Sequence, residues 1–191
     1  VECFINLTTL GVNANQAPTI DVTALTSLVF FNFTFMNNGN ALTGGTVDIS
    51  QNTQLLQLRG GTNQLTSMNV DNNLLLQYIY LGVNNITSFS VTNNIDLYSY
   101  SIQSNLVTSI DVSTNVLLTT LNFDSNNAAG TLDTSTNVLL ENLYFTNNNI
   151  SVVDFTTNIK LKIIHCQYNW VNGIIDLSAS VLLENLNMGN C

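Results

Sequence analysis

Apolar and polar residues alternate in short segments that recur along the whole chain. In residues 142–146, apolar Leu143 and Phe145 alternate with polar or amphipathic neighbours. A period of two places alternate side chains on opposite faces of a β-strand, so the segment predicts a half-buried strand. A second alternation, in residues 109–113, predicts a short strand on the opposite side of the same structural unit.

A three-residue signal, in which aliphatic residues flank Asp, marks a repeat of about 21 residues; Ile110-Asp111-Val112 is a clear copy. Asn69 and Ser90 replace the acid in two copies. The central residues of the copies are numbers 21, 48, 69, 90, 111, 133, 154 and 176. The first interval is longer than the others, and its extra Asn- and Gly-rich residues predict a loop insertion at about 36–44. A fixed period of this length predicts a solenoid in which each coil covers the apolar face of the next.

Each repeat also carries apolar residues and asparagines at fixed places. Residues 140–150 read LENLYFTNNNI, which fits the pattern L-x-x-L-x-L-x-x-N-x-L. One column, here named the inner Asn column, contains Asn63, Asn84, Asn105, Asn126, Asn148 and Asn169. The other, here named the second Asn column, contains Asn52, Asn73, Asn94, Asn115, Asn137 and Asn158. Because an Asn amide can satisfy backbone groups within a turn, we interpret both columns as structural ladders.

This pattern resembles that of the leucine-rich-repeat family over essentially the whole chain. Residues 108–115 resemble the short bacterial subclass found in internalin-like surface proteins. The resemblance implies a mainly β solenoid of about nine coils, with little or no helix. It also implies a parallel sheet on one side and a short second strand opposite, in one domain spanning residues 1–191. The departures are a Phe-rich second coil and Gly60 at a core position.

The composition narrows the function. The chain has a net charge of -9 and only three basic residues, Arg59, Lys160 and Lys162, so it lacks the basic surface that nucleic acid requires. It has no apolar run of the roughly 18 residues that a membrane-spanning helix needs. Few lysines beside many Thr and Asn favour an extracellular or cell-surface location. The start at Val1 suggests a removed leader or a fragment of a longer array.

The sequence predicts neither an enzyme nor a cofactor or metal site. The single histidine, His165, alternates with Cys166 along a predicted strand, so the two side chains point to opposite faces and form no catalytic pair. Zinc ligands do not cluster, and there is no Gly-rich phosphate loop. The stacked Asp residues suggest either calcium or hydrogen bonds to their own turn amides. We favour the hydrogen bonds, because Asn69 and Ser90 interrupt the Asp column.

The resemblance implies a binding surface on the outward positions of the main sheet. The candidate residues are Arg59, Tyr78, Tyr80, Gln103, Tyr144 and His165. Exposed tyrosines beside amides suit recognition of a protein or glycan. A row of hydroxyls on the opposite side, as in residues 109–113, suggests a third possibility, an ice-binding face.

The end coils carry no polar caps, which solenoids normally need. Subunits that cover each other's ends would form a head-to-tail filament. Cys3 and Cys191 lie in the first and last coils and are candidates for an intersubunit disulfide, whereas Cys166 is interpreted as a core residue. The leading prediction is therefore an extracellular, non-catalytic structural protein that assembles with itself into a filament or surface layer. The alternative is a monomeric adhesin that binds protein or glycan.

Overall fold

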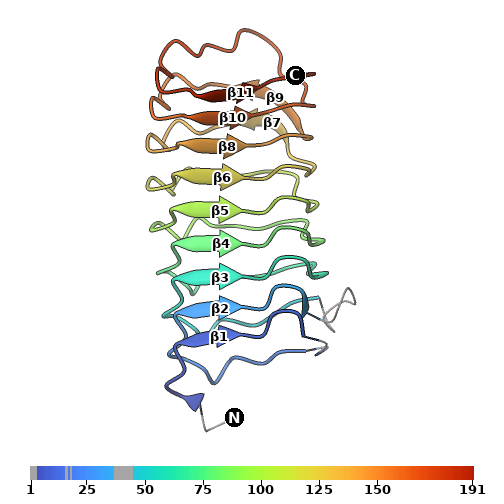
Figure 1. Ribbon diagram of the computed structural model, residues 1–191, viewed down its shortest axis with the longest axis vertical. Helices are drawn as coiled ribbons and strands as arrows, with labels where there is room; N and C mark the ends of the chain where they lie inside the picture. The colour runs from blue at the N-terminus through green and yellow to red at the C-terminus, as the bar shows by residue number, and fades with distance from the viewer. Residues whose placement is uncertain (1–3, 16, 18, 37–44) are drawn as a thin grey trace.

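A computed structural model describes residues 4–15, 17, 19–36 and 45–191, and the chain forms a stack of coils (Figure 1). Most of the expected insertion at 36–44, together with Cys3, lies outside the described residues. Each coil contributes one strand to a nine-stranded parallel sheet, the main sheet, so the expected solenoid of about nine coils is confirmed. No α-helix occurs among the described residues, and hence none that could cross a membrane.

The main sheet is built from three-residue strands in continuous register. Its strands in spatial order are β1 (Thr9–Gly11), β2 (Phe30–Asn32), β3 (Gln57–Arg59), β4 (Tyr78–Tyr80), β5 (Ser99–Ser101), β6 (Thr120–Asn122), β8 (Asn142–Tyr144), β10 (Ile163–His165) and β11 (Asn185–Asn187). The central residue of each strand pairs with that of the next, as Leu121 does with Leu143. From Phe31 in β2 to Ile164 in β10 these central side chains are buried, as the alternation of period two predicts.

The second sheet is smaller than the sequence pattern indicates. It contains two strands, β7 (Ala129–Leu132) and β9 (Asn149–Val153), and its register shifts between Gly130 and Thr131. The expectation of a strand in residues 109–113 is wrong. The Asp111 carboxylate accepts the backbone N–H of Ser113 at 3.0 Å, so this donor is not available to a ladder beyond the acid. Asp133 and Asp154 make the same bond directly after β7 and β9, so the bond limits how far a strand extends past the acid.

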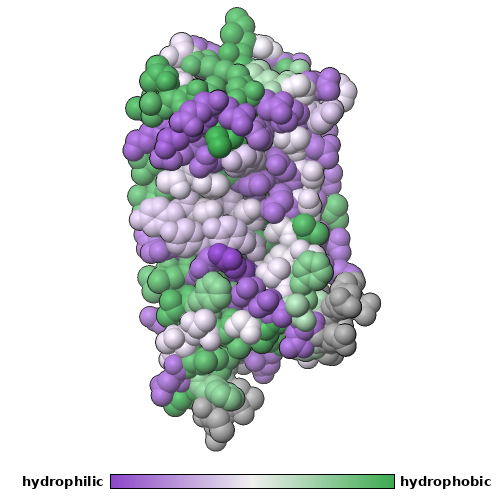
Figure 2. Space-filling model, in the orientation of Figure 1, coloured by the Kyte–Doolittle hydropathy of each residue, from purple (hydrophilic) through white to green (hydrophobic). Residues whose placement is uncertain are grey.

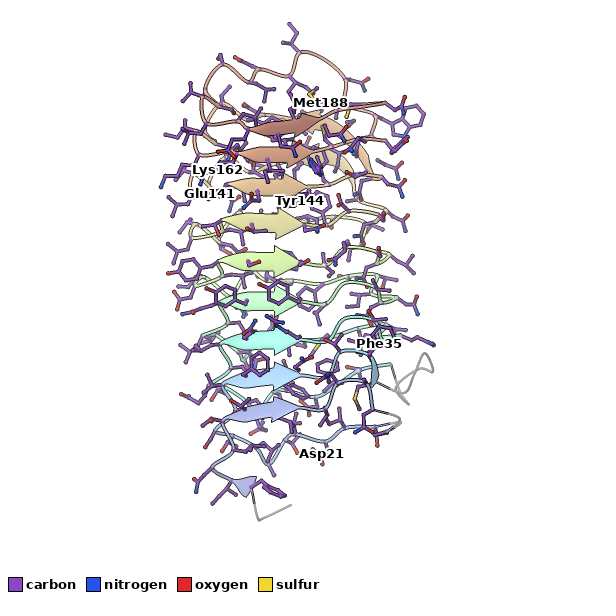
Figure 3. The ribbon with its side chains drawn as sticks, viewed as in Figure 1. Asp21, Phe35, Glu141, Tyr144, Lys162 and Met188 are labelled. Atoms are coloured by element: carbon purple, nitrogen blue, oxygen red, sulfur yellow. The ribbon has the colours of Figure 1, made fainter. Side chains whose placement is uncertain are left out.

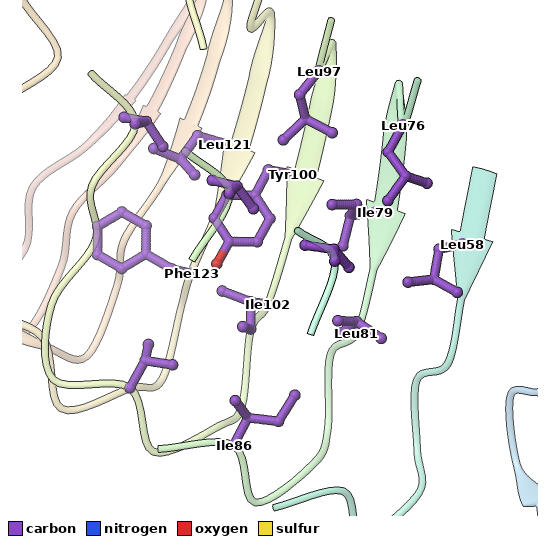
Figure 4. Packing of buried hydrophobic residues seen from close by; sticks show 14 of the residues in the cluster. Leu58, Leu76, Ile79, Leu81, Ile86, Leu97, Tyr100, Ile102, Leu121 and Phe123 are labelled. Atoms are coloured by element: carbon purple, nitrogen blue, oxygen red, sulfur yellow. The ribbon is translucent and has the colours of Figure 1, made fainter. Parts of the chain in front are cut away.

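A continuous apolar core fills the solenoid (Figure 4). Tyr100 replaces the usual aliphatic residue in β5, and burial raises the pKa of its hydroxyl above the ordinary value. The departure at Gly60 also has a physical explanation. A Cβ atom at Gly60 would lie 2.2 Å from Cζ of Phe33, so the Phe33 ring occupies the space that a side chain at 60 would need.

The two Asn columns bond the backbone in different ways. In the inner column, the Asn105 amide donates to the carbonyls of Leu81 and Ile102 at 3.0 Å each, and its Oδ1 accepts from the Ile86 N–H at 3.0 Å. In the second column, the Asn115 amide donates to the carbonyls of Val91 and Asn94 at 2.9 and 2.8 Å. Each amide thus joins adjacent coils, the inner column after the main-sheet strands and the second column in the turns that lead into them.

One residue in every coil has a left-handed backbone. The non-glycine residues with positive φ are Ala14, Phe35, Thr62, Val83, Ser104, Ser125, Asn147, Tyr168 and Asn190. From Thr62 to Tyr168, each directly precedes a member of the inner Asn column. Because β-branched residues rarely adopt this conformation, Thr62 and Val83 hold local strain that the stacked coils impose.

Candidate functional site

The outward face of the main sheet carries the predicted binding residues, which fall into two clusters. Arg59, Tyr80 and Gln103 lie together near β3 to β5, where they line one hollow. Tyr144 and His165 lie near each other on β8 and β10. Tyr78 stands apart from both clusters, and its ring lies 6.3 Å from that of Tyr98.

Arg59, at the end of β3, is held between aromatic rings. Its guanidinium carbon lies 5.1 Å from the centre of the Tyr80 ring and 5.8 Å from that of Phe30. With the Gln57 amide turned so that its oxygen faces Arg59, that oxygen accepts two hydrogen bonds from the guanidinium at 2.9 Å each. Cation–π contacts and the amide orient the charge, and Arg59 remains exposed to solvent.

The hollow beside Arg59 has a volume of about 400 Å³. Gly61 and Gly82 form part of its lining, and a Cβ at Gly82 would come within 2.4 Å of the Gln103 side chain. The Ser101 hydroxyl donates to Oε1 of Gln103 at 2.6 Å, which fixes the amide across Gly82. The Gln103 amide therefore fills the space beside Gly82, and the hollow extends between this amide and the Arg59 cation.

The second cluster, near β6 to β10, is more acidic. Oδ1 of Asp124 accepts the backbone N–H of Thr146 at 2.5 Å, and burial raises the pKa of Asp124 against the opposing effects of this bond and of His165. The Tyr144 and His165 rings meet edge to face with centres 5.2 Å apart. At the start of β8 and β10, Lys162 and Glu141 form an ion pair of 2.8 Å (Figure 3). Because the pair is exposed to solvent, it contributes little to stability.

On the side of the coil opposite the main sheet, the carboxylates of the Asp column accept hydrogen bonds from their own coil. Oδ1 of Asp133 accepts the Ser135 N–H at 2.9 Å, and that of Asp154 accepts the Thr156 N–H at 2.9 Å. Asn69 accepts the Asp71 N–H in the same way, so the turn does not require a charge. Among the described residues, no three His, Cys, Asp or Glu side chains are grouped so that they could hold a metal ion.

The two described cysteines lie beside each other. Sγ of Cys191 is 3.3 Å from Sγ of Cys166 within the same chain. Burial raises the pKa of the Cys166 thiol well above its ordinary value, and the neighbouring Cys191 adds to the rise. The sequence assigned Cys191 to an intersubunit contact with Cys3, which is outside the described residues. It did not pair Cys191 with Cys166, because the two occupy different columns of the repeat.

Sequence reasoning also missed the glycines of the hollow. Gly61 and Gly82 occupy the outward position that Thr34 and Gln103 occupy in the flanking coils. Two successive glycines in a column of polar residues were the available signal. Neither glycine has a positive φ, so the turn conformation does not explain them.

The parallel sheet, the 21-residue coil and the Asn columns together define a leucine-rich-repeat solenoid, and the resemblance seen in the sequence is confirmed. The sequence matches no protein-family model and no curated protein. Among solved structures, the chain is similar to the functional domain of InlJ from Listeria monocytogenes, which includes a cysteine ladder. The identity is 26% and the TM-score 0.82, over 97% of this chain and 44% of that one.

Two further structures extend the comparison. The leucine-rich-repeat protein LIC12759 of Leptospira interrogans is 19% identical with a TM-score of 0.78, over 94% of this chain and 48% of that one. The plant peptide hormone receptor RGFR1, in complex with RGF2, is 19% identical with a TM-score of 0.69, over 96% of this chain and 36% of that one. The chain thus spans less than half the length of these three structures.

Proposed function

We propose that this chain is a non-catalytic recognition module that binds a protein or peptide along the outward face of the main sheet. The observation that carries the proposal is the hollow between Arg59, Tyr80 and Gln103, whose glycines open space beside an oriented cation. Leucine-rich-repeat neighbours include internalins and a peptide hormone receptor, which supports a role in protein interaction.

The chemistry of the hollow favours an acidic or amide-bearing side chain of the ligand. The Arg59 guanidinium keeps donors free for a carboxylate or carbonyl, since Gln57 accepts bonds from only Nε and one Nη. The Tyr80 ring supplies a flat apolar wall, and Gln103 supplies an amide. Arg and Tyr are among the residue types that most often dominate the binding energy of a protein interface.

The test is selection of binding peptides from a random library, followed by calorimetry with the purified chain. We expect Arg59→Ala and Tyr80→Ala each to weaken the selected peptides by tenfold or more, about 1.4 kcal/mol. Lys160→Ala is the matched control, because it removes the same charge from a turn outside the main sheet. Peptides that bind wild type, Arg59→Ala and Tyr80→Ala equally well would place recognition elsewhere and contradict the proposal.

The end-to-end filament and the extracellular location stay predictions. Leu186 in β11 is exposed, whereas the equivalent Ile164 in β10 is buried. A second copy or further coils of the same chain would cover Leu186 equally well, so its exposure does not favour a filament. Negative-stain electron microscopy with and without reductant is the direct test. The ice-binding alternative is not favoured, because the second sheet has only two strands and an irregular register.

A further inference from the structure

The turns that lead into the main-sheet strands carry an unexpected set of side chains. Each turn is closed by a hydrogen bond from its fourth residue to its first, as between the Leu118 N–H and the Asn115 carbonyl at 3.0 Å. The two central residues of such a turn face solvent and are usually polar. Thr53 and Gln54 follow this rule, but from Leu74 onward the central residues are mainly aliphatic.

We name these twelve residues the turn stripe. Its first column contains Leu74, Ile95, Val116, Val138, Ile159 and Val181. Its second column contains Leu75, Asp96, Leu117, Leu139, Lys160 and Leu182. All six side chains of the first column are between 45% and 82% exposed. The turns lie at the tails of the strand arrows, along the left of Figure 1, and apolar surface recurs along the same margin in Figure 2.

The turn stripe is not explained by folding. From Leu76 to Leu161, the leucine that ends each turn is fully buried and already supplies the core contact. The central aliphatic residues are therefore not needed for this core contact, and those of the first column stay at least 45% exposed. Stacked about 4.8 Å apart over six turns, they form a continuous apolar ridge roughly 24 Å long. A contiguous exposed ridge of this kind on a soluble surface marks an interaction site.

When the second column is read in reverse, Lys160 takes the place of Asp96, and leucines take the places of leucines. The column is therefore complementary to a reversed copy of itself. A twofold axis midway between Val116 and Val138 would bring Asp96 of one copy opposite Lys160 of the other, on both sides of the axis. The remaining residues of that column are leucines, which would meet leucines. In the first column the same axis pairs Ile95 with Ile159. A twofold interface requires this reciprocity, because the same patch contacts itself in reverse.

The two charges fit this arrangement. Lys160 is one of only three basic residues in the chain. Among the described residues, the one ion pair joins Lys162 to Glu141. In the same part of the chain, the side chains of Asp96 and Lys160 take part in no hydrogen bond. An unpaired cation and an unpaired anion therefore lie the same number of coils from the centre of the apolar ridge.

We propose that a second copy of this chain docks antiparallel on the turn stripe, giving a twofold dimer with an aliphatic seam between two Asp96–Lys160 ion pairs. The dimer uses none of the residues of the hollow, so it is independent of the proposed recognition function. The ridge is only two residues wide and smaller than a standard interface of about 800 Å² per partner. We expect reversible association with a Kd on the order of 10 to 100 µM.

The experiment is sedimentation equilibrium of the purified chain up to about 500 µM, which exceeds the expected Kd. Wild type is expected to dimerise reversibly. In the Asp96→Lys variant, two lysines face each other across each charged contact, and in the Lys160→Glu variant two carboxylates do. Each variant alone should therefore dimerise at least tenfold more weakly than wild type. A mixture of the two variants should form a heterodimer, because both of its facing pairs then have opposite charge.

Controls separate the interface from general charge effects. Asp111→Lys makes the same charge change on another side of the coil and should dimerise like wild type. Circular dichroism melts confirm that each variant is folded, including the control, which loses the hydrogen bonds from Ser113 to the Asp111 carboxylate. Wild type that stays monomeric at the highest concentration overturns the proposal. So does a dimer that ignores both charge reversals, or a mixture that stays monomeric.

Discussion

The hydroxyl of Thr134 donates a hydrogen bond of 2.9 Å to Oδ1 of Asn158 in the following coil. Both side chains are buried. Thr134 occupies the position that Val91 and Val112 hold in other coils. The amide of Asn158 already donates to two backbone carbonyls, so the threonine completes its hydrogen bonding. Among the described residues, the other members of the second Asn column, from Asn52 to Asn137, accept no hydrogen bond at Oδ1.

This relationship predicts different effects for two exchanges between Thr and Val at equivalent positions. Thr134→Val should destabilise the chain by about 1 kcal/mol, because it removes the donor to Asn158. Val91→Thr should be close to neutral, because its new hydroxyl can reach Oδ1 of Asn115 across the same spacing. Val107→Thr is the control. It should lower the free energy of unfolding by about 2 kcal/mol, because it buries a hydroxyl that has no side-chain acceptor placed for it. Urea unfolding measures all three, and equal losses for Val91→Thr and Val107→Thr would contradict the argument.

Gly60 and Phe33 should behave as a coupled pair. A Cβ at Gly60 would meet the Phe33 ring at 2.2 Å, so Gly60→Ala should destabilise the chain by roughly 1–3 kcal/mol through overpacking. In a Phe33→Leu background the shorter side chain leaves room, and the same exchange should cost much less. A double-mutant cycle by urea unfolding gives the coupling energy. Strict additivity of the two substitutions would mean that the ring does not set the requirement for glycine.

Acid should weaken the solenoid through the Asp column. Hydrogen bonds from the side chain or backbone of the Ser or Thr two residues later lower the folded-state pKa of Asp21, Asp48, Asp111, Asp133, Asp154 and Asp176. A carboxylate whose pKa is lowered by folding stabilises the chain above its unfolded pKa of about 3.9 and loses this effect as the pH falls through the folded value. The melting temperature should therefore decrease when the pH is lowered below about 4.

Replacing these carboxylates tests that linkage. The triple variant Asp111→Asn, Asp133→Asn and Asp154→Asn should keep its turns at pH 7, since Asn69 already makes the same hydrogen bond. Its melting temperature should depend less on pH in the acid range. Asp124→Asn should make the melting temperature fall more steeply on acidification. Burial raises the pKa of Asp124, so its protonation at low pH favours the folded state, and the variant loses this contribution. An unchanged acid profile in the triple variant would exclude the Asp column as the cause.

The thiols of Cys166 and Cys191 predict an intrachain disulfide. Their sulfurs are 3.3 Å apart, and a small movement would bring them to the bond length of about 2.05 Å. With oxidised glutathione as the oxidant, the two thiols would lose two protons and two electrons, and the chain mass would fall by about 2 Da. Mass spectrometry and a non-reducing gel distinguish this product from a dimer joined through Cys3 and Cys191. A covalent dimer that Cys191→Ser abolishes, while Cys166→Ser does not, would favour the intersubunit link instead.

The sequence predicted the repeat and the main sheet because each depends on residue type at a fixed spacing. Leu143 and the inner Asn105 recur in their columns, and only one stacking arrangement buries both. The hollow could not be predicted in the same way, because it depends on how Gln103 lies over Gly82 in the neighbouring coil. Alternation predicted a strand through Asp111, but it does not reveal that this acid takes the amide of Ser113, as Asp133 and Asp154 take theirs directly after β7 and β9.

The left-handed residue of each coil was also invisible in the sequence, because its column contains residues as different as Ala14, Val83 and Tyr168. The stacked coils impose this conformation, and the residue type has little influence on it. Val83 has a φ of 60°, which disfavours a β-branched side chain, whereas Asn147 holds the equivalent position at 56° with a residue that tolerates it. The strain at Val83 is therefore an avoidable loss of stability.

Val83→Asn should stabilise the chain by about 1 kcal/mol, since left-handed backbone costs roughly that much for residues other than glycine and asparagine. Little packing is lost, because Val83 is 47% exposed. Val116→Asn is the matched control: Val116 is also 47% exposed, but its φ is not positive, so no gain is expected. Asn147→Val should lose what Val83→Asn gains. Thermal and urea unfolding at low micromolar concentration, below the expected dimerisation range, measure all three variants. Equal effects of Val83→Asn and Val116→Asn would show that polarity, and not backbone strain, sets the stability at this turn.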